Sequence, residues 1–412
     1  MTVVATRPLW AGRSLALVGI VLLAFNLRTA VAAVSPIYAV ISRDIPLGNL
    51  GIGFLGMLPP LSFAASGIVA PAVARRLGLE ATLAAACAAM VAGGILRASA
   101  GNYATLVAGS VVLLAGMGFG NILLPPVIKR YFPDRIGLMT ATYATLMAIG
   151  AAIPPLVAAP IAEATSWRIS LGTWGLVAVA AVVPWFFLWV RRRADDRASA
   201  NDGLVEEAAP QLVGRMWRSP VAWAITIAFA VPSFNVYAMF AWLPAIITDL
   251  TTLGATEAGG LLALFAIMGL PFALVVPLIA VRVRNVGWML ALGVAFFVTG
   301  YLGMLLAPAQ ATWLWVLLIG SGPIVFPLTL TLINLRTRTH EASVALSGFV
   351  QSIGYGAAAL GPLTLGFIHD VTGSWVAPLI FLIGLVLVAL IPAFVLARPR
   401  MVEDDLARPA SN

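Results

Sequence analysis

One arginine, Arg28, lies near the middle of a long apolar stretch close to the start of the chain. No Asp or Glu lies at a comparable depth in any apolar stretch of the sequence. A guanidinium stays protonated in proteins and presents a planar fork of N–H donors, which matches carboxylates and other small oxyanions. These residue types predict a binding site for an anion or a strongly electronegative molecule, with Arg28 as its anchor.

Further polar and aromatic side chains within the apolar stretches could complete such a site. Ser35 follows Arg28 by seven residues, so on one continuous helix the two would share a face. The other candidates for substrate binding are Asn121, Asn235, Tyr237, Trp242, Gln351 and Tyr355. Each could instead serve in packing or in hydrogen bonds between helices. Arg28 itself could bind backbone carbonyls of a broken helix, or pair with a peripheral acid such as Glu163.

Basic residues at the ends of apolar stretches are candidates for gating. They are Arg75, Arg76, Lys129 and Arg130. Lys129 and Arg130 are followed by Asp134, so an ion pair with Asp134 or with an acid of the central polar segment could close a gate. The alternative is that these charges only anchor the ends of membrane helices.

The composition identifies the elements that must position these residues. Of 412 residues, 61% are hydrophobic and 10% are charged, compared with roughly 25% charged in an ordinary soluble domain. Twelve apolar segments are long enough to cross a membrane, which takes about 20 residues. Backbone groups in lipid must be satisfied within a segment, and these runs are too continuously apolar for barrel strands. We predict an all-α membrane protein with twelve transmembrane helices.

The basic residues predict the orientation of these helices. With the N-terminus in the cytoplasm, 20 of the 24 Lys and Arg residues fall on the inner side, and the other four are Arg28, Arg43, Arg97 and Arg168. This asymmetry follows the positive-inside rule and predicts that both termini are cytoplasmic. The net charge of +8 therefore indicates topology and not nucleic-acid binding. A cleaved signal peptide is an alternative for the N-terminus, but eleven spans would then remain.

A polar segment divides the chain into two groups of six helices. We predict an N-terminal half at 1–190, a cytoplasmic linker at 191–218, a C-terminal half at 219–398 and a cytoplasmic tail at 399–412. The halves share weak sequence similarity, since the small residues of 150–152 recur at 356–358 and each run is followed by proline. Together these matches predict a parallel repeat, two pseudo-symmetric halves with a binding cavity between them near the midplane.

Several segments carry a family resemblance: NLRTAVAAVSP, NILLPPVIKRYFP, AWLPAI, GPIVFPLTL and QSIGYGAAALGP. With the twelve spans, they resemble the major facilitator superfamily and, within it, the cyanate and 2-nitroimidazole transporter family. The resemblance covers nearly the full length. It implies a secondary transporter in the bacterial cytoplasmic (inner) membrane, working by alternating access on a small anion or compact polar nitrogenous compound.

Two departures from the superfamily pattern keep an alternative open. The segment PAVARRLGLE has Ala74 at the position where the superfamily motif has an acid that helps to close the inner gate. If this protein closes its inner gate through an ion pair, the acid must come from another residue. The fifth span reads GAAIPPL in place of the full motif of proton-driven drug exporters, which weakens a drug-export role without excluding it. The alternative function is export of larger apolar or aromatic compounds, with Arg28 in a structural role.

The sequence disfavours an enzyme. It has two histidines, His340 and His369, no HExxH pattern, no phosphate-binding loop and a single cysteine, Cys87. We therefore expect no cofactor, no metal site and no nucleic-acid partner, and a monomer whose partners are a small-molecule substrate and the lipid bilayer. Without a buried acid to titrate, we expect proton coupling to act through the substrate's own ionisation, through His369, or not at all.

Overall fold

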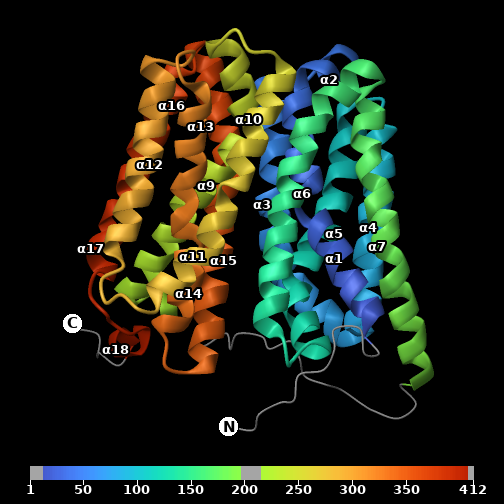
Figure 1. Cartoon of the computed structure of the whole chain (residues 1–412), viewed down its shortest axis with the longest axis vertical. Helices are drawn as coiled ribbons and strands as arrows, with labels where there is room; N and C mark the ends of the chain where they lie inside the picture. Colours follow the sequence, from blue (N-terminus) through green and yellow to red (C-terminus); the bar gives the residue numbers. More distant parts are fainter. Residues whose placement is uncertain (1–12, 196–214, 407–412) are drawn as a thin grey trace. The chain divides into compact units, whose positions relative to one another are not determined.

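The computed structural model describes residues 13–195 and 215–406, and its regular structure there is helical (Figure 1). Twelve spans in these residues are long and apolar enough to cross a membrane, which confirms the prediction of an all-α membrane protein. They are Ser14–Asp44, Asn49–Leu77, Leu79–Ala98, Tyr103–Tyr131, Ile136–Ala164, Trp167–Arg191, Pro220–Leu250, Ala255–Ala280, Gly287–Leu306, Thr312–Leu335, Glu341–Thr372 and Val376–Leu396.

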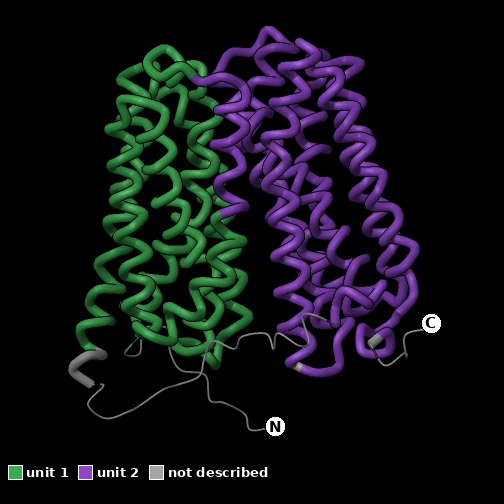
Figure 2. The backbone as a smooth tube through the Cα atoms, turned by 180° about the vertical axis from the view of Figure 1, so that it is seen from behind, with its two compact units in different colours: residues 1–46, 62–206 green, residues 47–61, 207–412 purple. Residues whose placement is uncertain are grey.

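The chain forms two compact units, coloured separately in Figure 2. Unit 1 comprises Met1–Pro46 and Ser62–Glu206, and unit 2 comprises Leu47–Leu61 and Glu207–Asn412. The first part of the second span, predicted to lie in the N-terminal half, thus belongs to unit 2. Most of the predicted linker, 191–218, and part of the predicted tail, 399–412, lie outside the described residues.

The helices of the first six spans are α1 (Ser14–Ala32), η1 (Ser35–Ile37), α2 (Tyr38–Asp44), α3 (Asn49–Leu77), α4 (Leu79–Ala98), α5 (Tyr103–Tyr131), α6 (Ile136–Ala164) and α7 (Trp167–Asp195). The others are α9 (Pro220–Leu250), α10 (Ala255–Ile267), α11 (Gly269–Ala280), α12 (Gly287–Leu306), α13 (Thr312–Ser321), η2 (Gly322–Ile324), α14 (Val325–Leu335), α15 (His340–Thr372), α16 (Val376–Val388), α17 (Leu390–Leu396) and α18 (Val402–Leu406).

Local sequence explains where several helices begin and end. The side chains of Asn102, Ser219 and Thr339 accept hydrogen bonds from backbone N–H groups in the first turns of α5, α9 and α15. These N-caps satisfy donors that have no partner inside the helix. At the other end of α15, Gly373 adopts φ +63°, a left-handed conformation that glycine takes without steric cost.

The first span is not one continuous helix. α1 ends at Ala32, a short 3₁₀ turn over Ser35–Ile37 follows, and α2 begins at Tyr38. Pro36 lies within this turn, where its ring and missing N–H disfavour a regular α-helix. The prediction that Arg28 and Ser35 share a face assumed an unbroken helix, and it was wrong on that point.

Within unit 1, α4 and α5 are in close contact along a seam of glycines. A Cβ at Gly93 would lie 2.3 Å from the backbone N of Leu113, and one at Gly109 would lie 2.6 Å from the backbone N of Arg97. α1 packs similarly on α6, since a Cβ at Gly150 would lie 2.1 Å from the carbonyl oxygen of Phe25. Small residues let membrane helices approach backbone to backbone.

Unit 2 contains a buried polar pair. The hydroxyl of Tyr301 donates a hydrogen bond to Asn235 Oδ1 at 2.8 Å, and both side chains are fully buried. Asn235 Nδ2 in turn donates to the carbonyl of Val231 at 2.8 Å. This pair links α9 to α12.

Replacing Tyr301 by phenylalanine is expected to lower the thermal unfolding midpoint of the purified protein. The change leaves Asn235 Oδ1 buried without its donor, which costs about 1–3 kcal/mol of unfolding free energy. Adding Asn235→Leu should recover much of the loss, because both polar partners are then gone. A matched control is Tyr143→Phe, at a half-buried tyrosine of unit 1. Equal effects of the Tyr301 and Tyr143 changes would contradict the prediction.

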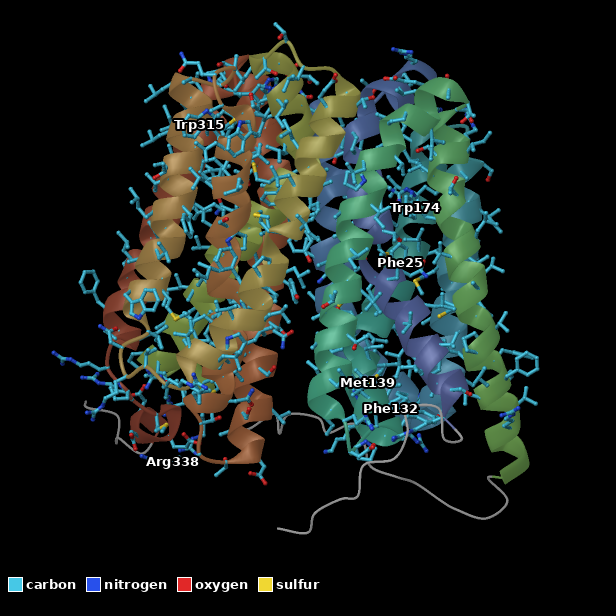
Figure 3. All side chains as sticks on the ribbon, viewed as in Figure 1. Phe25, Phe132, Met139, Trp174, Trp315 and Arg338 are labelled. Atoms are coloured by element: carbon cyan, nitrogen blue, oxygen red, sulfur yellow. The ribbon has the colours of Figure 1, made fainter. Side chains whose placement is uncertain are left out.

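The described end of the chain folds back onto unit 2 as α18. Asp405 Oδ2 accepts hydrogen bonds from the Ser219 hydroxyl at 2.8 Å and the Val221 N–H at 3.3 Å, at the start of α9. Glu403 Oε1 accepts from the Arg338 N–H at 2.7 Å, just before α15. Arg338 also pairs with Asp404 at 2.7 Å, and Figure 3 shows Arg338 beside α18. Three successive acids therefore bind the starts of two long helices.

Candidate functional site

Arg28 lies on α1, half-buried within unit 1. Its guanidinium carbon is 4.9 Å from the centroid of the Phe63 ring on α3, a cation–π arrangement. One terminal nitrogen of the guanidinium is buried and has no hydrogen-bond partner. The ion pairs found in 13–195 and 215–406 do not include Arg28. The guanidinium therefore keeps at least one buried donor for a ligand.

Two further candidates lie in the same unit. Ser35, in η1, is 7% exposed, and its hydroxyl oxygen is buried without a hydrogen-bond partner. Asn121, on α5, is half-buried. Both can bind a polar ligand, although the break after Ala32 removes the simple helical relation between Arg28 and Ser35. Their roles in substrate binding stay predictions.

Two of the candidates in unit 2 are committed to other contacts. The indole Nε1 of Trp242 donates to the carbonyl oxygen of Pro362 at 2.7 Å, and Trp242 is 2% exposed. Asn235 is bonded to Tyr301 and Val231, as described above. Both residues join helices of unit 2, the function that buried polar side chains commonly serve in membrane bundles. A substrate contact at either residue stays a prediction.

The remaining candidates form an aromatic group with a polar neighbour. The ring of Tyr355 lies 5.2 Å from that of Phe229 and 6.4 Å from that of Tyr237, each edge to face. Gln351, one turn earlier on α15, is half-buried and donates to the Ser347 hydroxyl at 2.7 Å. The structure thus brings together Tyr237 of α9 and Tyr355 of α15, with Gln351 one turn before Tyr355, and aromatic walls of this type suit a compact flat ligand.

The predicted gating residues differ in their environments. Arg130 lies 3.5 Å from the carboxylate of Glu80, which also accepts a 2.6 Å hydrogen bond from the hydroxyl of Tyr131. Glu80 is 2% exposed. Asp134, the predicted partner of Lys129 and Arg130, is instead paired with Arg13 and lies 3.7 Å from Arg135. A pair of Arg130 with Asp134 was one of the alternatives that the sequence left open; in the structure Arg130 pairs with Glu80 at the start of α4.

The pair of Arg13 and Asp134 is bidentate. Two guanidinium nitrogens donate to the two carboxylate oxygens at 2.5 and 2.8 Å, and one of them also donates to the Tyr131 carbonyl at 3.0 Å. The hydrogen bond with Asp134 raises the pKa of Arg13. The guanidinium also lies over the Phe132 ring, at 4.7 Å from its centroid; Figure 3 labels Phe132 at this end of unit 1. These contacts tie the start of α1 to the turn between α5 and α6.

The other three predicted gating residues, Arg75, Arg76 and Lys129, are exposed. Exposed charges of this kind suit helix anchoring at the membrane surface. Sequence reasoning missed Glu80, although one signal could have revealed it. Gly78, with φ +86°, separates α3 from α4 and places Glu80 in the first turn of a new helix, where an acid is favoured.

Replacing Glu80 by glutamine is expected to lower the unfolding free energy by about 1–3 kcal/mol. The amide can still accept from Tyr131, but the charge of Arg130 loses its buried counter-ion. The measurements are the thermal unfolding midpoint and the uptake rate in proteoliposomes. The uptake rate should change because the contact between Arg130 and residue 80 is weaker. Glu257→Gln serves as the control, because Glu257 is exposed at the start of α10. An unchanged midpoint for Glu80→Gln would contradict the prediction.

His369, one of the routes that the sequence left open for proton coupling, lies near the end of α15. Its ring is 4.1 Å from that of Trp375, and its Nδ1 lies 3.2 Å from Asn49 Nδ2. Asn49 also donates to Asp370 at 2.5 Å. These contacts of Asn49 connect the start of α3 to the end of α15 within unit 2. A part in proton coupling stays a prediction.

Comparison with known proteins agrees with this architecture. The family model for the Major Facilitator Superfamily matches residues 17–355. The chain is 32% identical to the 2-nitroimidazole transporter of Escherichia coli (strain K12) over 369 residues, which are 89% of this chain and 91% of that protein. It is 26% identical to the cyanate transport protein CynX of the same organism over 386 residues, covering 90% of this chain and 95% of that one.

A solved structure shares the fold. A bacterial homologue of the human lysosomal transporter Spinster, in an inward-facing and unoccupied conformation, matches with a TM-score of 0.73 and 16% identity. The match covers 98% of this chain and 100% of that chain. The chain therefore belongs to the Major Facilitator Superfamily, a family of transporters and not of enzymes, and it is related to the 2-nitroimidazole and cyanate transporters.

Proposed function

We propose that this protein is a secondary transporter that moves a small anion or a compact polar nitrogenous compound by alternating access, with Arg28 as the substrate anchor. The observation that carries the proposal is the Arg28 guanidinium, half-buried, with a buried nitrogen that has no partner. A charge near the centre of a membrane helix costs about 2.5–3.5 kcal/mol on insertion scales. A bound anion would offset part of that cost.

The chemistry of the guanidinium supports both substrate types named for the relatives. Cyanate is a small anion and would pair with the charge directly. A nitro group is neutral overall, but its two oxygens are spaced much like those of a carboxylate and can accept from the planar fork. The edge-to-face aromatic group of Tyr237 and Tyr355 suits a flat heterocycle.

One observation favours a second candidate function. Phe63 lies against the Arg28 guanidinium, and this contact can stabilise the charge by about 0.5–2 kcal/mol without a ligand. Arg28 would then be structural, and the cargo would be a larger apolar or aromatic compound that leaves the cell. The two candidates differ in whether a small anion or nitro compound binds at Arg28.

We also propose that the protein lies in the bacterial cytoplasmic membrane as a monomer with both termini in the cytoplasm. The distribution of Lys and Arg supports this orientation. The ion pairs Arg13–Asp134 and Arg130–Glu80 would then lie at the cytoplasmic end of unit 1 and act as part of the inner gate.

A thermal-shift screen of the purified protein tests the substrate class. Sodium cyanate, 2-nitroimidazole and a larger aromatic dye are added separately to the parent and to Arg28→Ala. A ligand at 100 times its Kd should stabilise the folded state by about 2.7 kcal/mol. We expect cyanate or 2-nitroimidazole to stabilise the parent but not Arg28→Ala. Stabilisation by the dye alone, in both proteins, would overturn the proposal and support the second candidate.

A further inference from the structure

A buried arginine, Arg97, lies in the last turn of α4. It is one of the four basic residues that do not fall on the inner side, and it is only 6% exposed. One guanidinium nitrogen donates to the carbonyl of Ala30 on α1 at 3.2 Å. Its Nε is buried without a hydrogen-bond partner, and the ion pairs of the described part of unit 1 do not include it. A buried, unpaired charge of this kind is costly.

Arg97 lines a small cavity inside unit 1, formed by residues of α1, α4, α5 and α7. The cavity volume is about 20 Å³, which holds one or two water-sized particles. Trp174 of α7 lines the same cavity, and its indole Nε1 is also buried without a hydrogen-bond partner. Figure 3 shows Trp174 well away from Phe132, towards the other end of unit 1.

The polar groups around the cavity include two unused donors beside a charged guanidinium. Arg97 Nε and Trp174 Nε1 are unused donors, and neither side chain can accept. Thr29 already donates its hydroxyl proton to the Asn26 carbonyl, and Asn26 Nδ2 donates to the Leu22 carbonyl. Acceptors are therefore left on Asn26 Oδ1 and Thr29 Oγ1, beside a fixed positive charge. A water molecule could accept from both donors and donate to these acceptors, but it would leave the charge of Arg97 without a counter-ion, which an anion supplies.

We propose that this cavity binds one small monovalent anion of the halide type, with chloride as the best fit, held by Arg97 Nε and Trp174 Nε1. The anion neutralises Arg97 and links α4 to α7. The site is distinct from that of Arg28, which does not line the cavity. Because the cavity is only about 20 Å³, chloride should bind more tightly than bromide and bromide more tightly than iodide.

The test is thermal unfolding of the purified full chain at constant ionic strength, with sodium gluconate replaced stepwise by chloride, bromide or iodide. The parent should show a saturable rise in the unfolding midpoint, largest for chloride. Trp174→Phe keeps an aromatic, though smaller, side chain and removes one donor, so the chloride concentration at half-saturation should rise at least about tenfold. Arg97→Gln should lose the response.

Arg28→Ala should keep the full chloride response, which separates this site from the proposed substrate site. The proposal is overturned if the parent unfolds at the same temperature in gluconate and chloride, or if Trp174→Phe responds like the parent. Should Arg97→Gln fail to fold, the Trp174 variant and anomalous diffraction from bromide-soaked crystals decide. A peak beside Arg97 Nε supports the proposal, and ordered water there without a peak contradicts it.

Discussion

Replacing Arg28 by alanine is expected to abolish substrate binding and uptake while the protein still folds. The variant loses both the charge and the buried donor that has no partner within the described structure. Arg28→Lys keeps the charge but replaces a planar fork with a point charge, so binding should weaken by about 10–100-fold, the equivalent of one or two charge-assisted hydrogen bonds. The measurement is uptake of labelled cyanate and 2-nitroimidazole into proteoliposomes, with KM and the maximal rate determined separately.

Two control variants make this result specific. Arg43→Gln removes an exposed arginine of the same span and should leave uptake unchanged. Phe63→Leu removes the ring beside the guanidinium but keeps the guanidinium itself. If Arg28 binds substrate, Phe63→Leu should raise KM far less than Arg28→Ala does. If Arg28→Ala transports normally and both variants lose stability equally, the arginine is structural and the anchor role is wrong.

The sequence was sufficient for the fold because one physical requirement dominates in a membrane. Backbone groups in lipid must bond within their own segment, so a run of about 20 apolar residues has few alternatives to a helix. All twelve spans follow from that argument. The break after Ala32 did not, because Ser35 and Pro36 lie in a run that is apolar on both sides and shows no change in composition.

The candidate site could be predicted less well, and individual residues show why. Arg28 was identifiable because a charge far from any helix end has few explanations. Arg97 is the penultimate residue of its helix, where arginines commonly reach the membrane surface, and its burial depends on the packing of α1 and α7. Glu80 likewise resembled a surface acid until the fold placed Tyr131 against it.

The hydrogen-bond partners of buried polar groups could not be predicted from the sequence either. Asn235 and Trp242 have the right types and spacing for a binding face, yet their bonds go to Tyr301 and Pro362. A buried amide or indole can bind a substrate or join two helices. Residues more than sixty positions away along the chain decide between these functions. Helical periodicity predicts which residues share a face of one helix, but not which residues of other helices contact that face.

The second large effect concerns the seam between α4 and α5. Replacing Gly93 by alanine is expected to reduce the yield of folded protein sharply, because the new Cβ would lie 2.3 Å from the Leu113 N and 2.6 Å from the Gly109 O. Both are backbone atoms, which cannot rotate away as a side chain can, so the helices must separate at a cost of about 3 kcal/mol or more. The measurement is the monodisperse fraction in size-exclusion chromatography together with the thermal unfolding midpoint.

The adjacent residue provides the matched control. Gly94 is also buried in α4, but its nearest contact for a new Cβ is a Leu113 methyl carbon at 3.8 Å, an ordinary van der Waals distance. Alanine favours a helix over glycine by about 1 kcal/mol, so Gly94→Ala should be neutral or stabilising. Two neighbouring changes of identical chemistry should thus act in opposite directions, because one meets the α5 backbone and the other does not. Equal behaviour of the two variants would mean that α4 and α5 are not packed as closely as described.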